Sequence, residues 1–265
     1  MINVFMVTGT ALAETDVDAK IQQTHDIARQ WRRGAYSLNG DTPVLNPEEV
    51  GRPELPRLVQ PRDLPKRGLG TQKGRIAMMH AVAHIEFNAI NLALDADHRF
   101  RNMPRDYYRD WLRVADEEAR HFSMVRDYLR ENSHDYGDFD AHNGLWEMAE
   151  KTATDVLERM ALVPRVLEAR GLDVTPAIID KLRQAGDREA VAILEVIYSE
   201  EIGHVKIGTR WFRHICAERG LAPDQVFRKL LKKHFPNGLH GPFNRDARDR
   251  AGFSETEMRY LTAHP

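Results

Sequence analysis

Apolar residues recur at helical spacing along most of the chain, and the alternation typical of strands is almost absent. Four stretches of about 25 residues each carry a single apolar stripe, and they span 74–98, 105–131, 144–170 and 188–218. Helices with one apolar face each are what a four-helix bundle requires, because each face is buried against the other helices. The pattern therefore predicts an all-α protein built on a four-helix bundle.

Local signals set the ends of these predicted helices. Pro104 precedes the second helix, and Asp187 precedes the fourth. Gly171 is a natural C-cap for the third helix, and Pro176 opens a short connecting helix after it. Pro164 lies inside the third helix, where it removes a backbone hydrogen bond, so we expect a kink there.

Both flanks of the bundle have their own character. An amphipathic helix is predicted over 16–36, and six prolines between 40 and 72 predict an extended segment, because each disfavours helix at the residue before it. We therefore divide the chain into three parts. Residues 1–72 form an N-terminal helix and an extended Pro/Arg-rich wrapping segment, 73–221 form the bundle, and 222–265 form a C-terminal helix and tail packed on it.

Composition excludes several classes of protein. The 38 Lys and Arg nearly balance the 40 Asp and Glu, which argues against a dedicated nucleic-acid coat. The single cysteine, Cys216, excludes an intrachain disulfide framework and cysteine-based zinc or iron–sulfur sites. No apolar run reaches the ~18 residues of a membrane helix, and the short N-terminal apolar stretch lacks the basic residues of a signal peptide. We expect a cytoplasmic protein with no membrane partner.

Charged residues stand inside the apolar stripes. Glu86 lies on the stripe of the first bundle helix, where an unpaired carboxylate would cost several kcal/mol. The second helix carries Glu118 and His121, and the fourth carries Glu201 and His204. Glu and His three residues apart project from one face of a helix, so each pair can bind one metal ion. A further Glu-x-x-His at 131–134 stands at a helix end without apolar flanks, and we attribute it to chance.

The spacing of these residues indicates a repeat of two helical hairpins. Glu118 follows Glu86 by 32 residues, and Glu201 follows Glu168 of the third helix by 33. This offset selects Glu168 over its rival Glu158. Glu158 is mid-helix, but it falls on a solvated face among Lys151, Thr154 and Arg165. Each hairpin then supplies one Glu and one Glu-x-x-His pair.

The chemistry of this set fits two divalent ions. Its four carboxylates would balance two Fe²⁺, and in the absence of metal they would repel one another and take up protons. Oxygen and imidazole ligands suit Fe or Mn. We therefore predict two iron ions, with Mn/Fe as an alternative, and no catalytic residue beyond the metal ligands. The predicted ligands are Glu86, Glu118, His121, Glu168, Glu201 and His204.

Neighbouring features have two interpretations. His80 and His84 lie off the stripe of Glu86, which favours a structural role over a functional one. The basic stretches 52–75 and 228–250 are more simply solvated extensions that pair with acidic helix faces than a surface for RNA, because no aromatic-rich RNA motif accompanies them.

Two Glu and two Glu-x-x-His motifs on four helices resemble the ferritin-like di-iron carboxylate superfamily. The segments GRIAMMHAVAHIEFNAINLALDA, GLWEMAEKT and RMALVPRVLEARGLDVTP are more narrowly similar to a bacterial family of ferritin-like proteins of unknown function, over about residues 50–250. The resemblance implies a dimetal site and a relation to tRNA-modifying di-iron hydroxylases. It does not supply a substrate.

These observations lead to an expected function and one alternative. We expect a di-iron oxidoreductase that uses O₂ to oxidise or hydroxylate an organic substrate, for which the resemblance suggests a modified nucleoside in tRNA. The electron donor stays open, and a monomer or dimer is expected. The alternative is iron binding without turnover, as in ferroxidases or oxidative-stress proteins.

Overall fold

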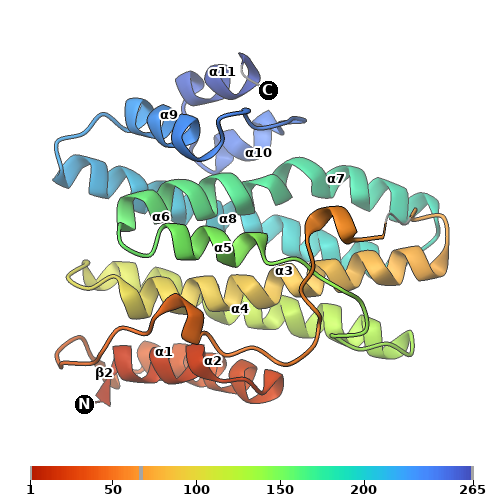
Figure 1. Cartoon of the computed structure of the whole chain (residues 1–265), viewed down its shortest axis with the longest axis horizontal. Coiled ribbons are helices and arrows are strands. Elements are labelled where there is room, and N and C mark those ends of the chain that lie inside the picture. The colour runs from red at the N-terminus through yellow and green to blue at the C-terminus, as the bar shows by residue number, and fades with distance from the viewer. Residues whose placement is uncertain (1, 66–67, 264–265) are drawn as a thin grey trace. The chain divides into compact units, whose positions relative to one another are not determined.

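The computed structural model describes residues 2–65 and 68–263, and the chain divides into two compact units, Met1–Glu150 and Lys151–Pro265. Nearly all regular structure in the described residues is helical (Figure 1). The strands of this part of the chain are one short parallel pair, β1 (Ile2–Asn3) and β2 (Tyr36–Ser37). The predicted all-α class is confirmed. The predicted boundaries near residues 72 and 221 stay predictions.

The first unit is built on two long, unbroken helices. These are α3 (Gln72–Arg99) and α4 (Arg105–Glu131), which run side by side in Figure 1. The bounds of α4 are those predicted, and α3 extends the prediction 74–98 at both ends. Thr71 begins α3 by accepting a hydrogen bond from the Gly74 N–H, as N-cap threonines do.

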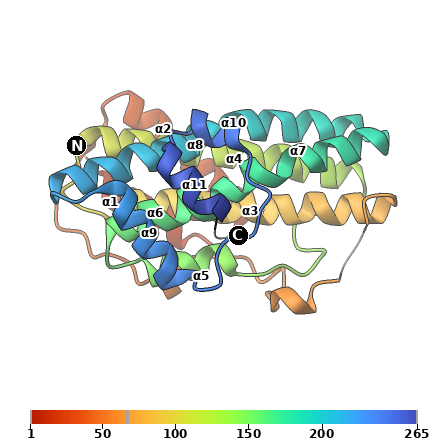
Figure 2. The same ribbon diagram turned by 90° about the horizontal axis from the view of Figure 1, so that it is seen from above.

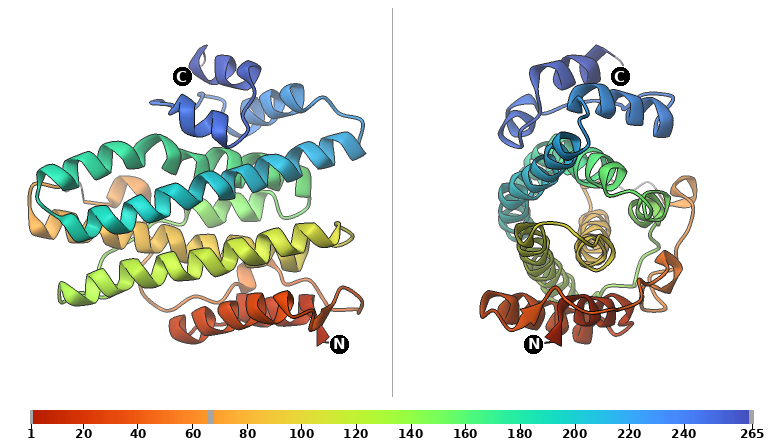
Figure 3. Two further views of the ribbon diagram at one scale, coloured as in Figure 1. Left: turned by 180° about the vertical axis from the view of Figure 1, so that it is seen from behind. Right: turned by 90° about the vertical axis from the view of Figure 1, so that its left-hand side faces the viewer.

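Two shorter helices pack on this pair. Helix α1 (Val4–Ala13) packs on α3, and α2 (Val17–Arg32) packs on α4 (Figure 3). Asp16 caps α2 by accepting from the Ala19 N–H, so the predicted helix 16–36 is confirmed with a shorter C-terminal end. Helix α1 was absent from the prediction and uses the apolar N-terminal stretch.

The segment between α2 and α3 is extended, as its prolines predict. It contains only two 3₁₀ turns, η1 (Pro47–Glu49) and η2 (Pro61–Asp63). Lys20 fixes it to the first unit, because its buried ammonium donates to the Leu12 and Gly51 carbonyls and to Asn91 Oδ1 at 2.6–3.0 Å. Burial, followed by the charge of Arg52, lowers the pKa of Lys20 to about 7.

The predicted boundaries of the third bundle helix are wrong. Instead of one helix over 144–170, the chain forms α5 (Gly144–Lys151), α6 (Val156–Leu162), a π-helix η3 (Val163–Glu168) and α7 (Ala169–Gln184). Gly171 and Pro176, predicted to end this helix and open another, both lie inside α7. The segments α6, η3 and α7 pack on α8 (Arg188–Glu218), whose bounds are those predicted.

Two prolines lie on this path, one in η3 and one inside α7, and neighbouring residues accommodate both. Pro164 is the second residue of η3, and a Cβ on Gly208 would lie only 2.3 Å from its Cγ, so the glycine allows α8 to approach the proline ring. Pro176 cannot donate to the carbonyl of Leu172, four residues earlier. Asn244 Nδ2 donates to that carbonyl instead, at 3.1 Å, and α7 continues through the proline.

Three helices complete the second unit. They are α9 (Pro223–His234), α10 (Arg245–Arg250) and α11 (Glu255–Ala263), and within this unit they gather beside α6–α8 (Figures 2 and 3). Two buried ion pairs anchor α11 and α10. Arg165 Nη2 donates to Glu257 of α11 at 2.6 Å, and Arg248 Nη2 of α10 donates to Asp173 at 2.6 Å. The predicted C-terminal helix is therefore one of three.

None of the helices in the described ranges combines the length and the apolar character that crossing a membrane would demand.

Candidate metal centre

Three predicted ligands meet on the helices of the first unit. His121 Nδ1 lies 3.2 Å from an oxygen of Glu86 and 3.4 Å from an oxygen of Glu118. The three residues are between 0 and 4% exposed, and each offers a ligand atom within 4.8 Å of the others. Glu118 and His121 are one turn apart on α4, and α3 supplies Glu86. This buried cluster could hold a metal ion.

The charges within this cluster favour a cation. Burial opposes an imidazolium, but the hydrogen bonds and charges of Glu118 and Glu86 outweigh it and raise the pKa of His121 to about 11. A proton on His121 therefore balances part of the buried negative charge when no metal is bound. Two carboxylates and an imidazole are donors that suit Fe²⁺ or Mn²⁺, so the residues present fit the predicted metals.

The second unit repeats the Glu-x-x-His geometry. On α8, His204 Nδ1 lies 3.3 Å from Glu201 Oε1, close to the 3.4 Å between His121 and Glu118. His204 is buried, and the Glu201 side chain is 14% exposed. The two pairs are thus preorganised in the same way within their own units.

The remaining predicted ligand is Glu168, the last residue of η3. Its side chain is half-buried, and its assignment as a ligand stays a prediction. Its rival Glu158 accepts hydrogen bonds from Lys233 Nζ at 2.7 Å and His234 Nε2 at 3.1 Å, so it belongs to an ion-pair cluster with α9. The expectation that Arg165 shares a solvated face with Glu158 is wrong, because Arg165 is fully buried.

His80 and His84 hold the loop that follows α4. His84 Nδ1 is hydrogen-bonded to the Tyr136 hydroxyl at 2.9 Å, its Nε2 is 3.1 Å from the His142 carbonyl oxygen, and His80 Nε2 accepts from the Gly137 N–H. Burial is the largest cause that lowers the pKa of His84 to about 4. These contacts support the structural interpretation of both residues.

Sequence reasoning missed Tyr136. Its ring lies 5.3 Å from that of Phe87 and 5.1 Å from that of Phe122, and these phenylalanines directly follow Glu86 and His121 in the chain. The three rings therefore pack together within the first unit, and Tyr136 joins the loop after α4 to both helices. Tyr136 stands in a loop, where no periodicity marks it, so the sequence carries no signal for this contact.

Comparisons with known proteins identify the family of this chain. The family described as "Protein of unknown function (DUF455)" matches residues 13–259. A protein of Haemophilus influenzae, described as "Uncharacterized protein", is 49% identical over 230 residues, which are 83% of this chain and 80% of that protein. No solved structure matches the chain. The chain therefore belongs to the DUF455 family of proteins of unknown function.

Proposed function

We propose that this protein is a ferritin-like dimetal oxidoreductase, which uses O₂ to oxidise or hydroxylate an organic substrate. The observation that carries the proposal is His121, buried between the carboxylates of Glu86 and Glu118. A buried set of this kind is costly in an ordinary helical core, because charged groups lose their hydration there. The matching pair of Glu201 and His204 supports a second, equivalent half of the site.

In this proposal each helical hairpin supplies the ligands of one ion. The first hairpin is α3 and α4, with Glu86, Glu118 and His121. The second is formed by η3 and α8, with Glu168, Glu201 and His204. Two Fe²⁺, or a Mn/Fe pair, would balance the four carboxylates and would supply the redox chemistry that activates O₂.

The chain's own residues supply position and shielding. The Glu-x-x-His turns hold their oxygens and imidazoles on one face of α4 and of α8 before any metal binds. In this proposal the packed rings of Tyr136, Phe87 and Phe122 shield the first half-site from water. A modified nucleoside of tRNA as substrate, an external electron donor and a monomeric or dimeric state complete the proposal, and the nucleoside rests on the family resemblance alone.

Metal analysis after anaerobic loading with Fe(II) tests the proposal. We expect about two ions per chain for the wild type, and a change in the optical spectrum on exposure to O₂. Saturation at zero or one ion would contradict the dimetal site. Elution as a large cage in size-exclusion chromatography would favour the alternative, iron storage without turnover.

Matched variants separate the halves. Glu118→Ala and Glu201→Ala should each bind one ion or none, because each loses a carboxylate of one half. Glu168→Ala should lose metal as well, whereas Glu158→Ala should keep two ions, since its carboxylate is bound by Lys233 and His234. The reverse order of the last two variants would move the sixth ligand to Glu158.

A further inference from the structure

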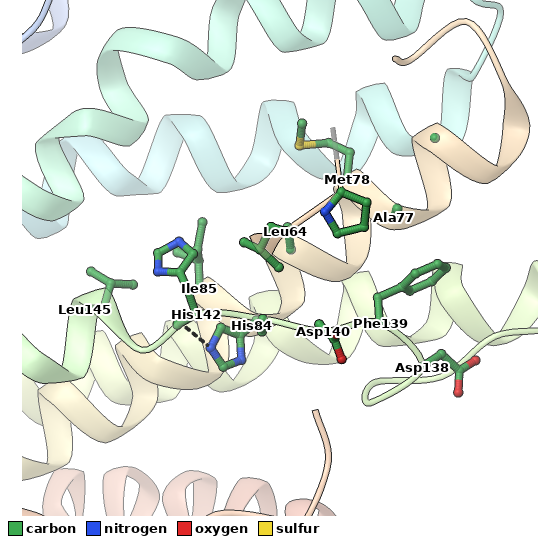
Figure 4. Close-up of a pocket in the computed structure, with 14 residues that line it drawn as sticks. Leu64, Ala77, Met78, His84, Ile85, Asp138, Phe139, Asp140, His142 and Leu145 are labelled. Carbon is green, nitrogen blue, oxygen red and sulfur yellow. Dashed lines mark hydrogen bonds between the residues drawn. The ribbon is translucent and has the colours of Figure 1, made fainter. Parts of the chain in front are cut away.

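A cavity of about 400 Å³ opens beside α3 within the first unit (Figure 4). One wall is the face of α3 that carries Ala77, Ala81 and Ile85, and the opposite wall is the segment from Asp138 to Leu145. Leu64 and Pro65 of the extended segment also line it. Its volume lies in the range of small-molecule sites, and most of its side chains are apolar, as in such sites.

The cavity is preformed. On α3, Gly74, Ala77 and Ala81 lie at intervals of three and four residues, so this face is flat and fills little space. The opposite wall is fixed by backbone hydrogen bonds, since the Ala141 N–H donates to the Arg57 carbonyl at 3.0 Å and the Val59 N–H donates to the Ala141 carbonyl at 2.8 Å. These bonds hold the wall around Ala141 against residues 57–59 before any ligand binds.

Two histidines form the polar end of the cavity. His84 already has partners at both ring nitrogens. Its Nδ1 is hydrogen-bonded to the Tyr136 hydroxyl, and its Nε2 lies 3.1 Å from the His142 carbonyl oxygen (Figure 4). His142 Nδ1 accepts from the Gly144 N–H at 3.2 Å, which places the proton of a neutral ring on Nε2. Among the described residues no hydrogen-bond partner is found for that Nε2, so it can donate to a bound molecule.

The charges of the lining disfavour an anion. No lysine or arginine occurs among the described residues that line the cavity. Asp140 is neutralised by Arg57, which donates two hydrogen bonds to it at 2.6 and 3.1 Å, whereas exposed Asp138 accepts only from the Asp135 N–H among described partners. Among the described lining residues, a phosphate or carboxylate group would therefore meet Asp138 and no lysine or arginine.

Three large apolar side chains at the cavity or near its walls are exposed to solvent. Ile85, which lines it, is 47% exposed. Leu58, paired with lining residue Ala141, is 41% exposed, and Leu55, which lies against Gly137, is 58% exposed. Exposed large apolar side chains that gather at one place mark binding sites.

We propose that this cavity binds an uncharged, mainly apolar small molecule that accepts a hydrogen bond from His142 Nε2. The small residues of α3 receive its apolar body, and the histidine end orients its acceptor, such as a carbonyl oxygen. This site does not depend on the proposed metal chemistry, so either can fail alone.

Fluorescence titration of the full chain with Nile red, which is uncharged and carries a ring carbonyl, tests the proposal. We expect saturable binding of one dye per chain. Ala81→Trp should weaken it at least about tenfold, because the indole fills an exposed edge of the cavity without entering the core. The matched control is Ala217→Trp, at an exposed alanine of α8, which should leave the affinity unchanged. His142→Ala should weaken binding about five- to tenfold, the value of one hydrogen bond.

Three results would overturn the proposal. They are no saturable binding of Nile red, equal affinity in Ala81→Trp and the wild type, and tighter binding of the anion anilinonaphthalene sulfonate than of Nile red. If Ala81→Trp does not fold, the ¹³C-methyl signal of Met78, a lining residue, provides the readout in the wild type. That signal, assigned by Met78→Leu, should shift on addition of Nile red, and an unmoved signal would contradict the site.

Discussion

The two hairpins carry the same order of proposed ligands on helices of different regularity. In the first unit α3 and α4 are unbroken, and Glu118 and His121 stand on a helix of 27 residues. In the second unit α8 is unbroken over 31 residues, but the chain that faces it is divided into α6, η3 and α7. The comparison teaches that a repeated motif can be presented by a regular helix or by an interrupted one, provided that other residues support the interruption.

Those supports are polar and buried in the second unit. The guanidinium of Arg165, on η3, lies 4.3–4.7 Å from the ring centroids of Phe212, Phe227 and Phe253, and it donates to Glu257. The first hairpin is covered by α1 and α2, whose buried residues include Phe5, Ile27 and Trp31. The irregular hairpin should therefore be the more sensitive of the two to the loss of a single charge.

Arg165→Met should have the largest effect on this comparison. It leaves Glu257 buried without its cation, which we expect to destabilise the second unit by about 3–5 kcal/mol. Urea unfolding measures the loss, and Arg183→Met, at an exposed ion pair with Asp180 and Glu195, is the control with a loss below about 1 kcal/mol. Equal losses in both variants would show that the buried pair does not support η3.

Metal should stabilise both hairpins. Fe(II) at 100 to 1,000 times its Kd should raise the free energy of unfolding by about 3–4 kcal/mol, because it binds the folded chain alone. Thermal unfolding with and without a chelator measures this difference. Glu118→Ala and Glu201→Ala should each lose part of it, and a melting temperature that ignores Fe(II) in the wild type would contradict a buried site.

Acid should act on the first unit through His84. Between pH 6.5 and 4 the unfolded chain binds a proton at this residue and the folded chain does not, since its folded pKa is about 4. Stability is therefore lost as the pH falls through this window, by up to about 3 kcal/mol. His84→Gln should flatten this part of the pH profile, whereas His240→Gln, at an exposed position, should leave it as in the wild type. Identical profiles for all three proteins would refute the assignment.

The smallest effects distinguish two glycines of α8. A Cβ at Gly208 would meet the Pro164 ring at 2.3 Å, so Gly208→Ala should destabilise by about 1–3 kcal/mol. A Cβ at Gly203 would meet nothing within 4 Å, and Gly203→Ala should stabilise by about 0.5–1 kcal/mol through helix propensity. Chemical denaturation ranks the two variants, and a tolerated Gly208→Ala would mean that η3 and α8 can separate at no cost.

Periodicity predicted the regular helices well and the interrupted one badly. The bounds of α4 and α8 followed from stripes that stay in phase, and Glu86, Glu118 and His121 were found because they stand on such stripes. Helix α1 is apolar on nearly every side, so it has little period to detect. The turn at 152–155 and the π-helix shift the phase of the third stretch, so positions counted at 100° per residue no longer gave the right faces there.

Contacts between distant residues lay outside any local pattern. The pairing of Glu158 with Lys233 spans 75 residues, and the contact of Tyr136 with His84 spans 52. Such contacts depend on how the chain folds back on itself. The spacing of residues along one sequence does not encode this. The cavity beside α3 depends on the same kind of contact, between residues 57–59 and 141.

The hydrogen bond from Asn244 to the Leu172 carbonyl affects the order in which the chain can fold during its synthesis. The first unit has all of its own residues once position 150 has left the ribosome. Helix α7 instead waits for Asn244 and Arg248, and η3 waits for Glu257, which follows Arg165 by 92 residues. On the ribosome the first unit can fold during translation, while the second completes its structure only after Asn244, Arg248 and Glu257 have emerged.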